Sequence, residues 1–533
     1  MVASSCCTYK LKPKPFFFRL ISIPNSNRSV DFMLLRLLTP CHQLNTTLNS
    51  KMDIRRSKAK LQLLFINRLV FFHLFLLHPL FLHQPAVALS VVESLPGFQG
   101  PLPFKLETGY IGVDEGEDVQ LFYYFVKSES SPREDALVLW LTGGPGCSSF
   151  TAFAYEIGPL NFEVVQKDEN LPTLALNPNS WSKVASIIFV DLPVGTGFSY
   201  GRTFHASHST DLQACDQAYQ FMRKWFDDHS EFLQNPFYVG GDSYSGITVP
   251  IIFQLMSNGN EADLKPHINL KGYILGNPVT NVGDGIRYRI PFAHGMGLIS
   301  DELYESLKRS CKGQFDDVDP GNTECLKGLE AYTQCTSKLN HAQILEPHCA
   351  FASPKWQEFF TERRFLDEND MGLLLSDQSP CALYSRSNGY RLSYRWLNDD
   401  GVQEALHIRK GSIAKWSRCN YGVAYIIKIS SSFPYHVNLS KKGYRSLIYS
   451  GDHDLVVPFF GTQAWIRSLN YSIVEDWRSW VVQGQVAGYA RTYSNRMTFA
   501  TVKARNLSSL LALFNKDVMF FFFCPLSVFT SFG

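Results

Sequence analysis

The chain has 533 residues, 45% of them hydrophobic and 14% aromatic, which suffices for one large domain or for several smaller ones. Its 50 Lys and Arg against 48 Asp and Glu leave a formal net charge of +2, so nothing in the composition favours nucleic acid as a partner. The 12 cysteines form no C-x-x-C pair and no Cys/His cluster with zinc-finger spacing, so we expect no structural metal and no cofactor.

A basic start followed by an apolar run marks residues 52–88 as a secretory signal peptide. Four Lys or Arg residues between positions 55 and 60 precede the apolar stretch 61–82, and Ala86-Val87-Ala88 fits a cleavage site. A retained signal anchor is the alternative, because the apolar run approaches the roughly 20 residues that span a membrane. Arg68 and Pro79 argue against such a stable membrane anchor. Residues 1–51 are then interpreted as an upstream extension.

Entry into the secretory pathway has consequences for the rest of the chain. We expect the mature protein in the vacuole or outside the cell, where cysteines form disulfides. Within the domain at about 89–503, the N-x-S/T sites at Asn438 and Asn470 are then candidates for glycosylation.

Solid apolar runs ending at Gly or Pro predict strands buried on both faces, at 136–141, 185–193, 235–241, 270–278 and 445–454. The run 119–128 alternates and predicts an antiparallel strand, whereas 211–229 reads as a helix. Strands alternating with helices predict an α/β fold with a mostly parallel central sheet covered by helices on both faces. The domain extends over about 89–503, and a polar, Cys-rich cap insertion interrupts it at about 285–400.

Three glycine-rich or acidic motifs follow predicted strands, and a parallel sheet would bring them to one edge. In "GGDSYSG" (240–246), Ser243 nearly fits the nucleophile elbow G-x-S-x-G. "LTGGPGCSS" (141–149) can turn backbone N–H groups toward an oxyanion, and "SGDHD" (450–454) offers carboxylates late in the chain. Each motif alone has a simpler interpretation as a surface turn. "GTGFSYG" (195–201) lacks the spacing of a dinucleotide-binding loop.

Together with "NPNSWSKVASIIFVDLPVGTGFSY", "ILGNP", "VQEALHIR" and "YSGDHDLVVPFFGT", these motifs resemble the serine carboxypeptidase-like family of α/β-hydrolases, and its plant members closely, over about 92–503. The resemblance implies an α/β-hydrolase fold with Ser243 as the nucleophile. It implies an oxyanion hole made by the backbone N–H groups of Gly144 and Tyr244, and Asp454 as the acid that orients a catalytic histidine.

The resemblance also implies disulfide pairs and a substrate site. Cys147 would pair with Cys419, and the cap would hold the pairs Cys311–Cys325 and Cys349–Cys381. Cys335 would then have no disulfide partner. Its substrate-binding positions would be Thr142, Gly143, Glu156 and Asp242.

Carboxypeptidases of this family bind a peptide's C-terminal carboxylate with an Asn where this chain has Thr142, and with a Glu where it has Asp242. The plant acyltransferase branch instead moves an acyl group from a glucose ester to an alcohol-type acceptor through a serine ester. The two substitutions favour the acyltransferase branch, with a carboxypeptidase as the alternative.

The catalytic base is the missing part of this pattern. In α/β-hydrolases the histidine follows the acid in chain order, but the last of the 14 histidines here is His453. In the family, "TFATVK" leads into a glycine-rich turn bearing the histidine and then into a closing helix. Here "MTFATVK" ends at Lys503, and the apolar tail 504–533 contains no histidine.

We therefore expect the last catalytic turn and helix to be missing, and the chain to be an impaired enzyme or a catalytically dead secreted isoform. A gene-model artefact and a genuine truncated isoform are the two accounts of the tail. His294, His407 and His436 precede the acid, and we interpret them as cap or surface residues.

Overall fold

The computed structural model describes residues 90–163, 171–283, 285–346, 386–482 and 484–503. The predicted upstream extension, signal peptide, Cys349–Cys381 pair and apolar tail lie outside these residues and stay predictions.

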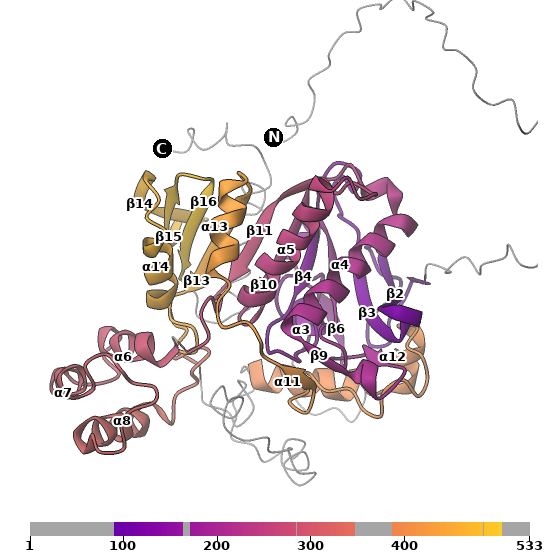
Figure 1. Ribbon diagram of the computed structural model, residues 1–533. Helices are drawn as coiled ribbons and strands as arrows, with labels where there is room; N and C mark the ends of the chain where they lie inside the picture. The colour runs from indigo at the N-terminus through magenta and orange to yellow at the C-terminus, as the bar shows by residue number, and fades with distance from the viewer. Residues whose placement is uncertain (1–89, 164–170, 284, 347–385, 483, 504–533) are drawn as a thin grey trace, which may run out of the picture. The chain divides into compact units, whose positions relative to one another are not determined.

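A large sheet forms the centre of the described chain (Figure 1). Its strands are β1 (Ser90–Val92), β2 (Leu106–Val113), β3 (Val119–Val126), β4 (Ala136–Leu141), β7 (Ala185–Val190), β8 (Tyr200–Gly201), β10 (Phe237–Asp242), β11 (Leu270–Gly276), β13 (Arg445–Gly451), β14 (Ile473–Val482), β15 (Gln485–Tyr493) and β16 (Met497–Val502). Two small sheets pair β5 (Leu160–Phe162) with β6 (Leu174–Leu176), and β9 (His208–Thr210) with β12 (Ala424–Ile426).

The strand order in the large sheet is β1-β2-β3-β7-β4-β10-β11-β13-β16-β15-β14, with β8 paired to β3. Its six central strands, from β7 to β16, all run parallel, while antiparallel strands extend the sheet at both edges. The carboxyl ends of β4, β10, β11 and β13 therefore lie along one edge, as the parallel sheet predicted from the sequence requires.

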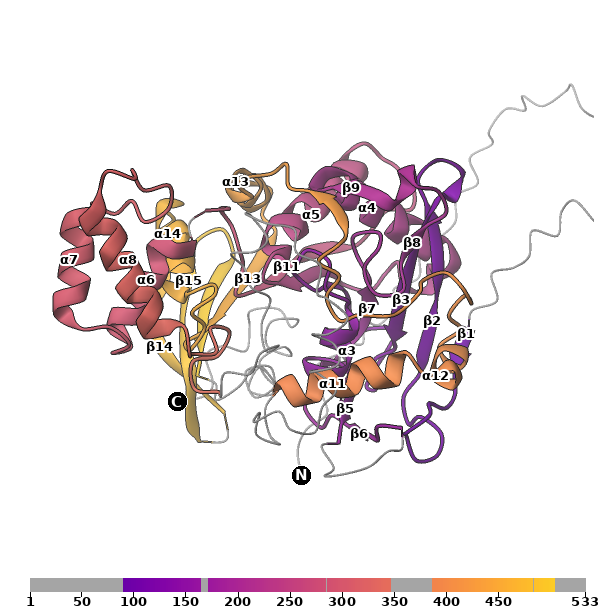
Figure 2. The same cartoon turned by 90° about the horizontal axis from the view of Figure 1, so that it is seen from below.

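Helices cover both faces of the sheet (Figure 2). Helices α4 (Asp211–Asp228), α5 (Ser245–Glu261), α13 (Phe433–Lys441) and α14 (Phe459–Ser468) pack on one face, and α3 (Phe150–Tyr155), α11 (Arg386–Leu397) and α12 (Asp400–Ala405) pack on the other. Four short 3-10 helices connect these elements: η2 (Glu115–Glu117), η3 (Trp181–Lys183), η4 (His205–Ser207) and η5 (Ser230–Phe232). Among the residues described, no helix is long and apolar enough to cross a bilayer.

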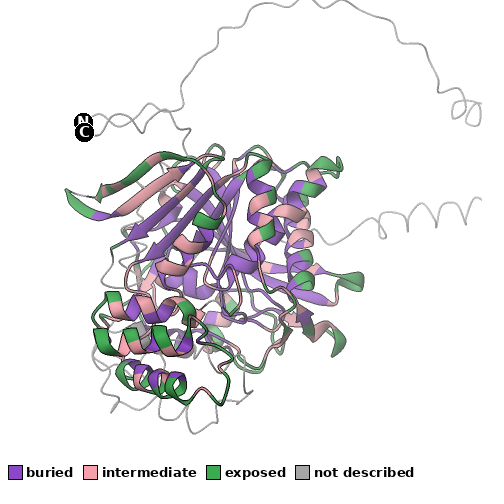
Figure 3. Cartoon of the chain, turned by 60° about the vertical axis from the view of Figure 1, so that its left-hand side comes forward, coloured by how far each residue is buried: buried purple, intermediate pink, exposed green. Residues whose placement is uncertain are grey.

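The prediction of an antiparallel strand at 119–128 is confirmed, because β3 pairs antiparallel with both β2 and β7. All eight residues of β3 are buried, and Figure 3 shows the strands at the centre of the sheet in the colour of buried residues. Phe122 and Tyr124 join the core on the α3 side, and Leu121 and Phe125 join the core on the α4 side. Because helices cover both faces of the sheet at β3, the tyrosine side chains of this strand lie in the core.

Helices α6 (Gly285–Gly295), α7 (Asp301–Cys311) and α8 (Thr323–Thr336) form a cap with a small core of its own, stapled by the Cys311–Cys325 disulfide. The predicted insertion reached to about residue 400, but α11 belongs to the main body. Trp396 is fully buried in the central core and stacks on Phe150 of α3 with ring centroids 5.6 Å apart.

Candidate active site

Ser243 lies on a strained turn between β10 and α5. Its φ of 55° is in the left-handed region, which residues with a side chain rarely adopt. Two backbone hydrogen bonds hold the turn: Ser243 donates to Gly276 O at 2.9 Å, and Val279 donates to Ser243 O at 2.9 Å. The side chain is only half-buried, so the hydroxyl is presented at the carboxyl edge of the sheet, as a nucleophile elbow requires.

The glycine-rich loop after β4 passes directly against this turn. A Cβ added to Gly143 would lie 2.7 Å from the Ser243 Cβ and 2.9 Å from the Tyr244 nitrogen, so a side chain at this position would displace the serine. Gly144 has a φ of 128°, which only glycine adopts readily. The two predicted oxyanion donors, Gly144 and Tyr244, thus belong to two segments in close contact.

Asp454 lies on the loop after β13, and three N–H groups fix its carboxylate. Its Oδ1 accepts from the Val456 and Val457 nitrogens at 2.6 and 3.1 Å, and its Oδ2 accepts from Asn277 Nδ2 at 2.7 Å. Asn277 follows Gly276, whose carbonyl accepts from Ser243. Asn277 thus ties the acid to the nucleophile, a role that the sequence analysis missed although "ILGNP" was among its motifs.

The strands β10 and β13, which carry the serine and the acid, are separated by β11. Two strand spacings amount to about 10 Å, a gap that an imidazole ring can bridge. His453 does not fill this place. Its Nδ1 instead lies 2.7 Å from Oδ1 of the neighbouring Asp452, without hydrogen-bond alignment.

Of the three histidines that were interpreted as cap or surface residues, two lie as the sequence suggested. His294 is in cap helix α6 and contacts Asp301, and His407 is exposed. The interpretation of His436 as a cap or surface residue is wrong. It is fully buried in α13, stacks on Trp465 at 4.6 Å, and burial lowers its pKa to about 3. The apolar residues around α13 explain this, because they accommodate a neutral imidazole.

Two of the predicted substrate-binding residues, Gly143 and Asp242, adjoin the Ser243 turn. Thr142 is buried, and its hydroxyl has no hydrogen-bond partner among the described residues. Asp242 Oδ1 accepts from the Gly143 nitrogen at 3.3 Å. Burial raises the pKa of Tyr449, and the nearby carboxylates of Glu156 and Asp242 raise it further, which places both acids around one tyrosine.

Arg418 also belongs to this group, although the sequence analysis did not single it out. Its guanidinium lies 4.1 Å from the Tyr390 ring centroid, and its positive charge favours the ionised form of Asp242. The only sequence feature that could have indicated Arg418 was its position next to Cys419, because the Cys147–Cys419 disulfide joins this part of the chain to the glycine-rich loop.

Asp242 provides a prediction about pH. Burial raises its pKa from 3.8 to about 7, against the opposing effects of the Gly143 N–H and the Arg418 charge. The folded state therefore binds this proton more tightly than the unfolded chain, so its contribution to stability is complete below pH 3.8 and is lost as the pH rises through 7. We expect Asp242→Asn to raise the melting temperature at pH 8 relative to the parent, with a smaller gain at pH 5.

Thermal unfolding monitored across this pH range checks the prediction. Asp216→Asn is the matched control, because Asp216 is an exposed carboxylate on α4. An Asp242→Asn gain that is the same at pH 5 and pH 8 would contradict the raised pKa.

A disulfide joins Cys147 in the glycine-rich loop to Cys419, as the family resemblance implies. Two backbone hydrogen bonds flank it: Ser148 donates to Arg418 O at 2.7 Å, and Asn420 donates to Gly146 O at 2.8 Å. The oxyanion loop is therefore fastened to a segment that is distant in sequence. Cys335 is a free, exposed cysteine.

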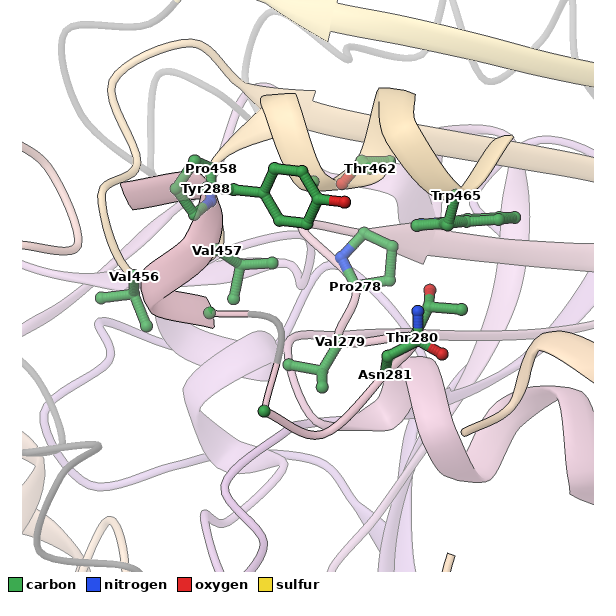
Figure 4. Close-up of a pocket in the computed structure, with 13 residues that line it drawn as sticks. Pro278, Val279, Thr280, Asn281, Tyr288, Val456, Val457, Pro458, Thr462 and Trp465 are labelled. Carbon is green, nitrogen blue, oxygen red and sulfur yellow. The ribbon is translucent and has the colours of Figure 1, made fainter. Parts of the chain in front are cut away.

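A small, mostly apolar pocket lies between the segment 278–288 and the segment 456–465 (Figure 4). Val279, whose nitrogen donates to Ser243 O, lines it together with Val456 and Val457, whose nitrogens donate to Asp454. The aromatic rings of Tyr288 and Trp465 complete the wall.

The two predicted glycosylation sites are both exposed, Asn438 on α13 and Asn470 after α14. Exposure makes both asparagines accessible, and their modification remains a prediction.

Comparison with known proteins agrees with this arrangement. A sequence model of the family described as serine carboxypeptidase matches residues 96–505. The chain is 52% identical over 424 residues to serine carboxypeptidase-like 7 of Arabidopsis thaliana, covering 80% of this chain and 90% of the relative. It is 53% identical over 416 residues to serine carboxypeptidase-like 12 of the same plant, covering 78% and 89%.

Among solved structures, the chain is similar to a prohormone-processing carboxypeptidase from Saccharomyces cerevisiae, with a TM-score of 0.58, 19% identity and coverage of 81% of this chain and 93% of the other. At that identity the likeness concerns the fold. With the motif residues gathered at one sheet edge and the family match spanning most of its length, the chain belongs to the serine carboxypeptidase family, peptidase S10.

Proposed function

We propose that this chain derives from a serine acyltransferase that takes an acyl group from a 1-O-glucose ester, and that its activity is impaired because the base of the triad is absent. The observation that carries the proposal is the altered carboxylate subsite beside Ser243, where Thr142 and Asp242 stand. A threonine hydroxyl offers a shorter donor than an asparagine amide, and aspartate is one methylene shorter than glutamate.

The geometry supports a two-step acyl transfer. In the first step Ser243 Oγ would attack the ester carbonyl, losing its proton and forming a C–O bond while the glucose oxygen leaves and takes up a proton. The backbone N–H groups of Gly144 and Tyr244 would stabilise the negative charge on the carbonyl oxygen. In the second step the hydroxyl of an acceptor would attack the Ser243 ester, and the serine would regain its proton.

We connect an aromatic acyl group with the pocket that is lined by Val279, whose nitrogen donates to Ser243 O. Its wall combines Val456, Val457, Tyr288 and Trp465, which suits a planar aromatic acyl chain better than a charged one. The acceptor would approach from the side of Asp242 and Arg418, where polar and charged groups gather.

A carboxypeptidase is the second candidate, supported by Glu156 and by the carboxyl of Asp242, which lie around Tyr449. Two neighbouring carboxyls that share a proton can bind a peptide carboxylate at acidic pH. The pKa of about 7 for Asp242 means that this proton is available at that pH.

Mass spectrometry of the Ser243 peptide tests the proposal in the chain as it is. Without a base both acylation and deacylation are slow, so an acyl-enzyme that forms should accumulate. We expect an added acyl mass on Ser243 after long incubation with an aromatic 1-O-glucose ester, and none in Ser243→Ala. Labelling from a blocked dipeptide alone would instead identify a carboxypeptidase, and labelling from neither donor would identify a non-catalytic protein.

We also propose entry into the secretory pathway, with the vacuole or the cell exterior as the destination. The two disulfides support this, because such bonds form and persist in oxidising compartments.

A further inference from the structure

Asp211 is a buried carboxylate that the reaction does not use directly. It is the first residue of α4 and has no exposed surface. An acid in the first turn of a helix ordinarily interacts with the free N–H groups there. Here Thr210 already caps the helix by accepting from the Gln213 nitrogen, so capping does not account for Asp211.

All four of the hydrogen bonds that Asp211 accepts come from other parts of the site. Its Oδ1 accepts the hydroxyl of Tyr244 at 2.6 Å and that of Tyr425 at 2.7 Å. Its Oδ2 accepts the backbone nitrogens of Lys428 and Ile429 at 2.5 and 2.8 Å. Four donors thus converge on one buried carboxyl, and hydrogen bonds to a carboxylate are among the strong ones.

Tyr244 is the residue next to the nucleophile, and its backbone N–H is one of the two predicted oxyanion donors. Its side chain is 2% exposed, and burial together with the bond to Asp211 raises the pKa of its hydroxyl, so that it stays a donor. Asp211 therefore holds the hydroxyl of Tyr244 by a hydrogen bond, and the backbone N–H of the same residue is a predicted oxyanion donor.

The other donors to Asp211 lie on the segment 418–429, which we call the strap. The strap starts at the Cys147–Cys419 disulfide, which fastens it to the loop of Gly144. Its strand β12 then pairs in parallel with β9, which immediately precedes Asp211. In both Figure 1 and Figure 2 the strap runs as an orange chain past β9 and α5 toward α13.

We propose that Asp211 is a positioning residue for the oxyanion hole, which sets the Tyr244 N–H through the tyrosine hydroxyl and aligns it with the Gly144 loop through the strap. The inference rests on the proposed acyl transfer at Ser243. Both halves of the oxyanion hole are held by one segment, the Gly144 half covalently and the Tyr244 half through Asp211.

A double-mutant cycle between Asp211→Asn and Tyr244→Phe tests the proposal. Tyr244→Phe keeps the backbone N–H and removes only the hydroxyl, and asparagine keeps the shape of the aspartate. Two readouts are used on the full chain: Ser243-dependent hydrolysis of the activated ester 4-nitrophenyl acetate, and hydrogen–deuterium exchange of peptides covering residues 243–249. Residual hydrolysis is a suitable probe because the oxyanion hole sustains catalysis when a triad member is missing.

We expect each single variant to lower kcat about ten- to a hundredfold with KM changed less than about twofold, since a small misplacement of an oxyanion donor acts on the transition state. The kcat of the double variant should be no lower than that of the less active single variant, because both changes break the same connection. Exchange should accelerate at 243–249 and not at the cap.

Tyr273→Phe and Asp216→Asn are the matched controls. Tyr273 is also buried, but its hydroxyl bonds His436 at 2.8 Å, and Asp216 is an exposed acid on the same helix as Asp211. Three outcomes would overturn the positioning role. They are additive effects in the cycle, a uniform acceleration of exchange over the whole domain, and no change in either readout.

The two proposals fail in different ways. If Ser243→Ala leaves ester hydrolysis unchanged, the turnover does not occur at Ser243 and the proposed function fails. The exchange cycle then still decides whether Asp211 holds Tyr244, because it requires no turnover.

Discussion

Replacing residues 504–533 by the glycine-rich, histidine-bearing turn and closing helix of an Arabidopsis serine carboxypeptidase-like relative is expected to raise turnover of a glucose ester by at least about 10⁴-fold, the scale lost when a triad member is removed. The two predicted partners of the introduced imidazole are held in place by the fold. Ser243 is presented on its strained turn, and Asp454 is fixed by three N–H donors. Steady-state turnover of chimera and parent, compared under the same conditions, measures the gain.

Two matched chimeras make this result specific. One carries glutamine in place of the introduced histidine, which keeps the turn and the helix but supplies no base. The other carries Ser243→Ala. If the glutamine chimera is as active as the histidine chimera, the gain comes from folding, and the missing base is not the cause of the weak activity.

Loss of the Cys147–Cys419 disulfide is expected to have the largest effect on stability. The bond closes a loop with a sequence separation of 272 residues. The chain-entropy account assigns about 5 to 6 kcal/mol of unfolding free energy to a loop of that length. We therefore expect Cys147→Ser with Cys419→Ser to lower the free energy of unfolding by about this amount at most, measured by urea denaturation under oxidising conditions.

The cap disulfide is the matched control. Cys311 and Cys325 are 14 residues apart, and the same account assigns about 3 kcal/mol to such a loop. Their replacement should leave hydrogen exchange at residues 143–149 unchanged, whereas loss of Cys147–Cys419 should accelerate it, because the oxyanion loop is then released. A larger loss of stability from the cap pair would contradict the entropy argument.

The strands that the sequence predicted best are those whose burial pattern is uniform. The runs 136–141 and 185–193 became β4 and β7, and 211–229 became α4, because solid apolar runs and helical periodicity report directly on the local environment. The antiparallel strand predicted at 119–128 is confirmed as β3. Which helices cover a strand depends on partners that are distant in the chain, and a local pattern does not report them.

The residues of the candidate site also fall into two groups, those that a motif could predict and those that it could not. Ser243, Gly144 and Asp454 could be named from motifs, because each chemical role needs a particular residue type at a strand end. Asn277, Arg418 and Asp211 could not, since single polar residues carry no local pattern.

From the sequence alone, the roles of Ser243 and Asp454 and the family's cysteine pairs could be predicted, and no histidine stands between Asp454 and Gly533. Only the tertiary structure shows that Asn277 connects Asp454 to the Ser243 turn, and that Asp211 joins the Tyr244 hydroxyl to the strap. The reason is physical: residue types and their spacing are encoded locally, whereas a hydrogen bond between residues 33 positions apart, such as Tyr244 to Asp211, exists only once packing brings the two together.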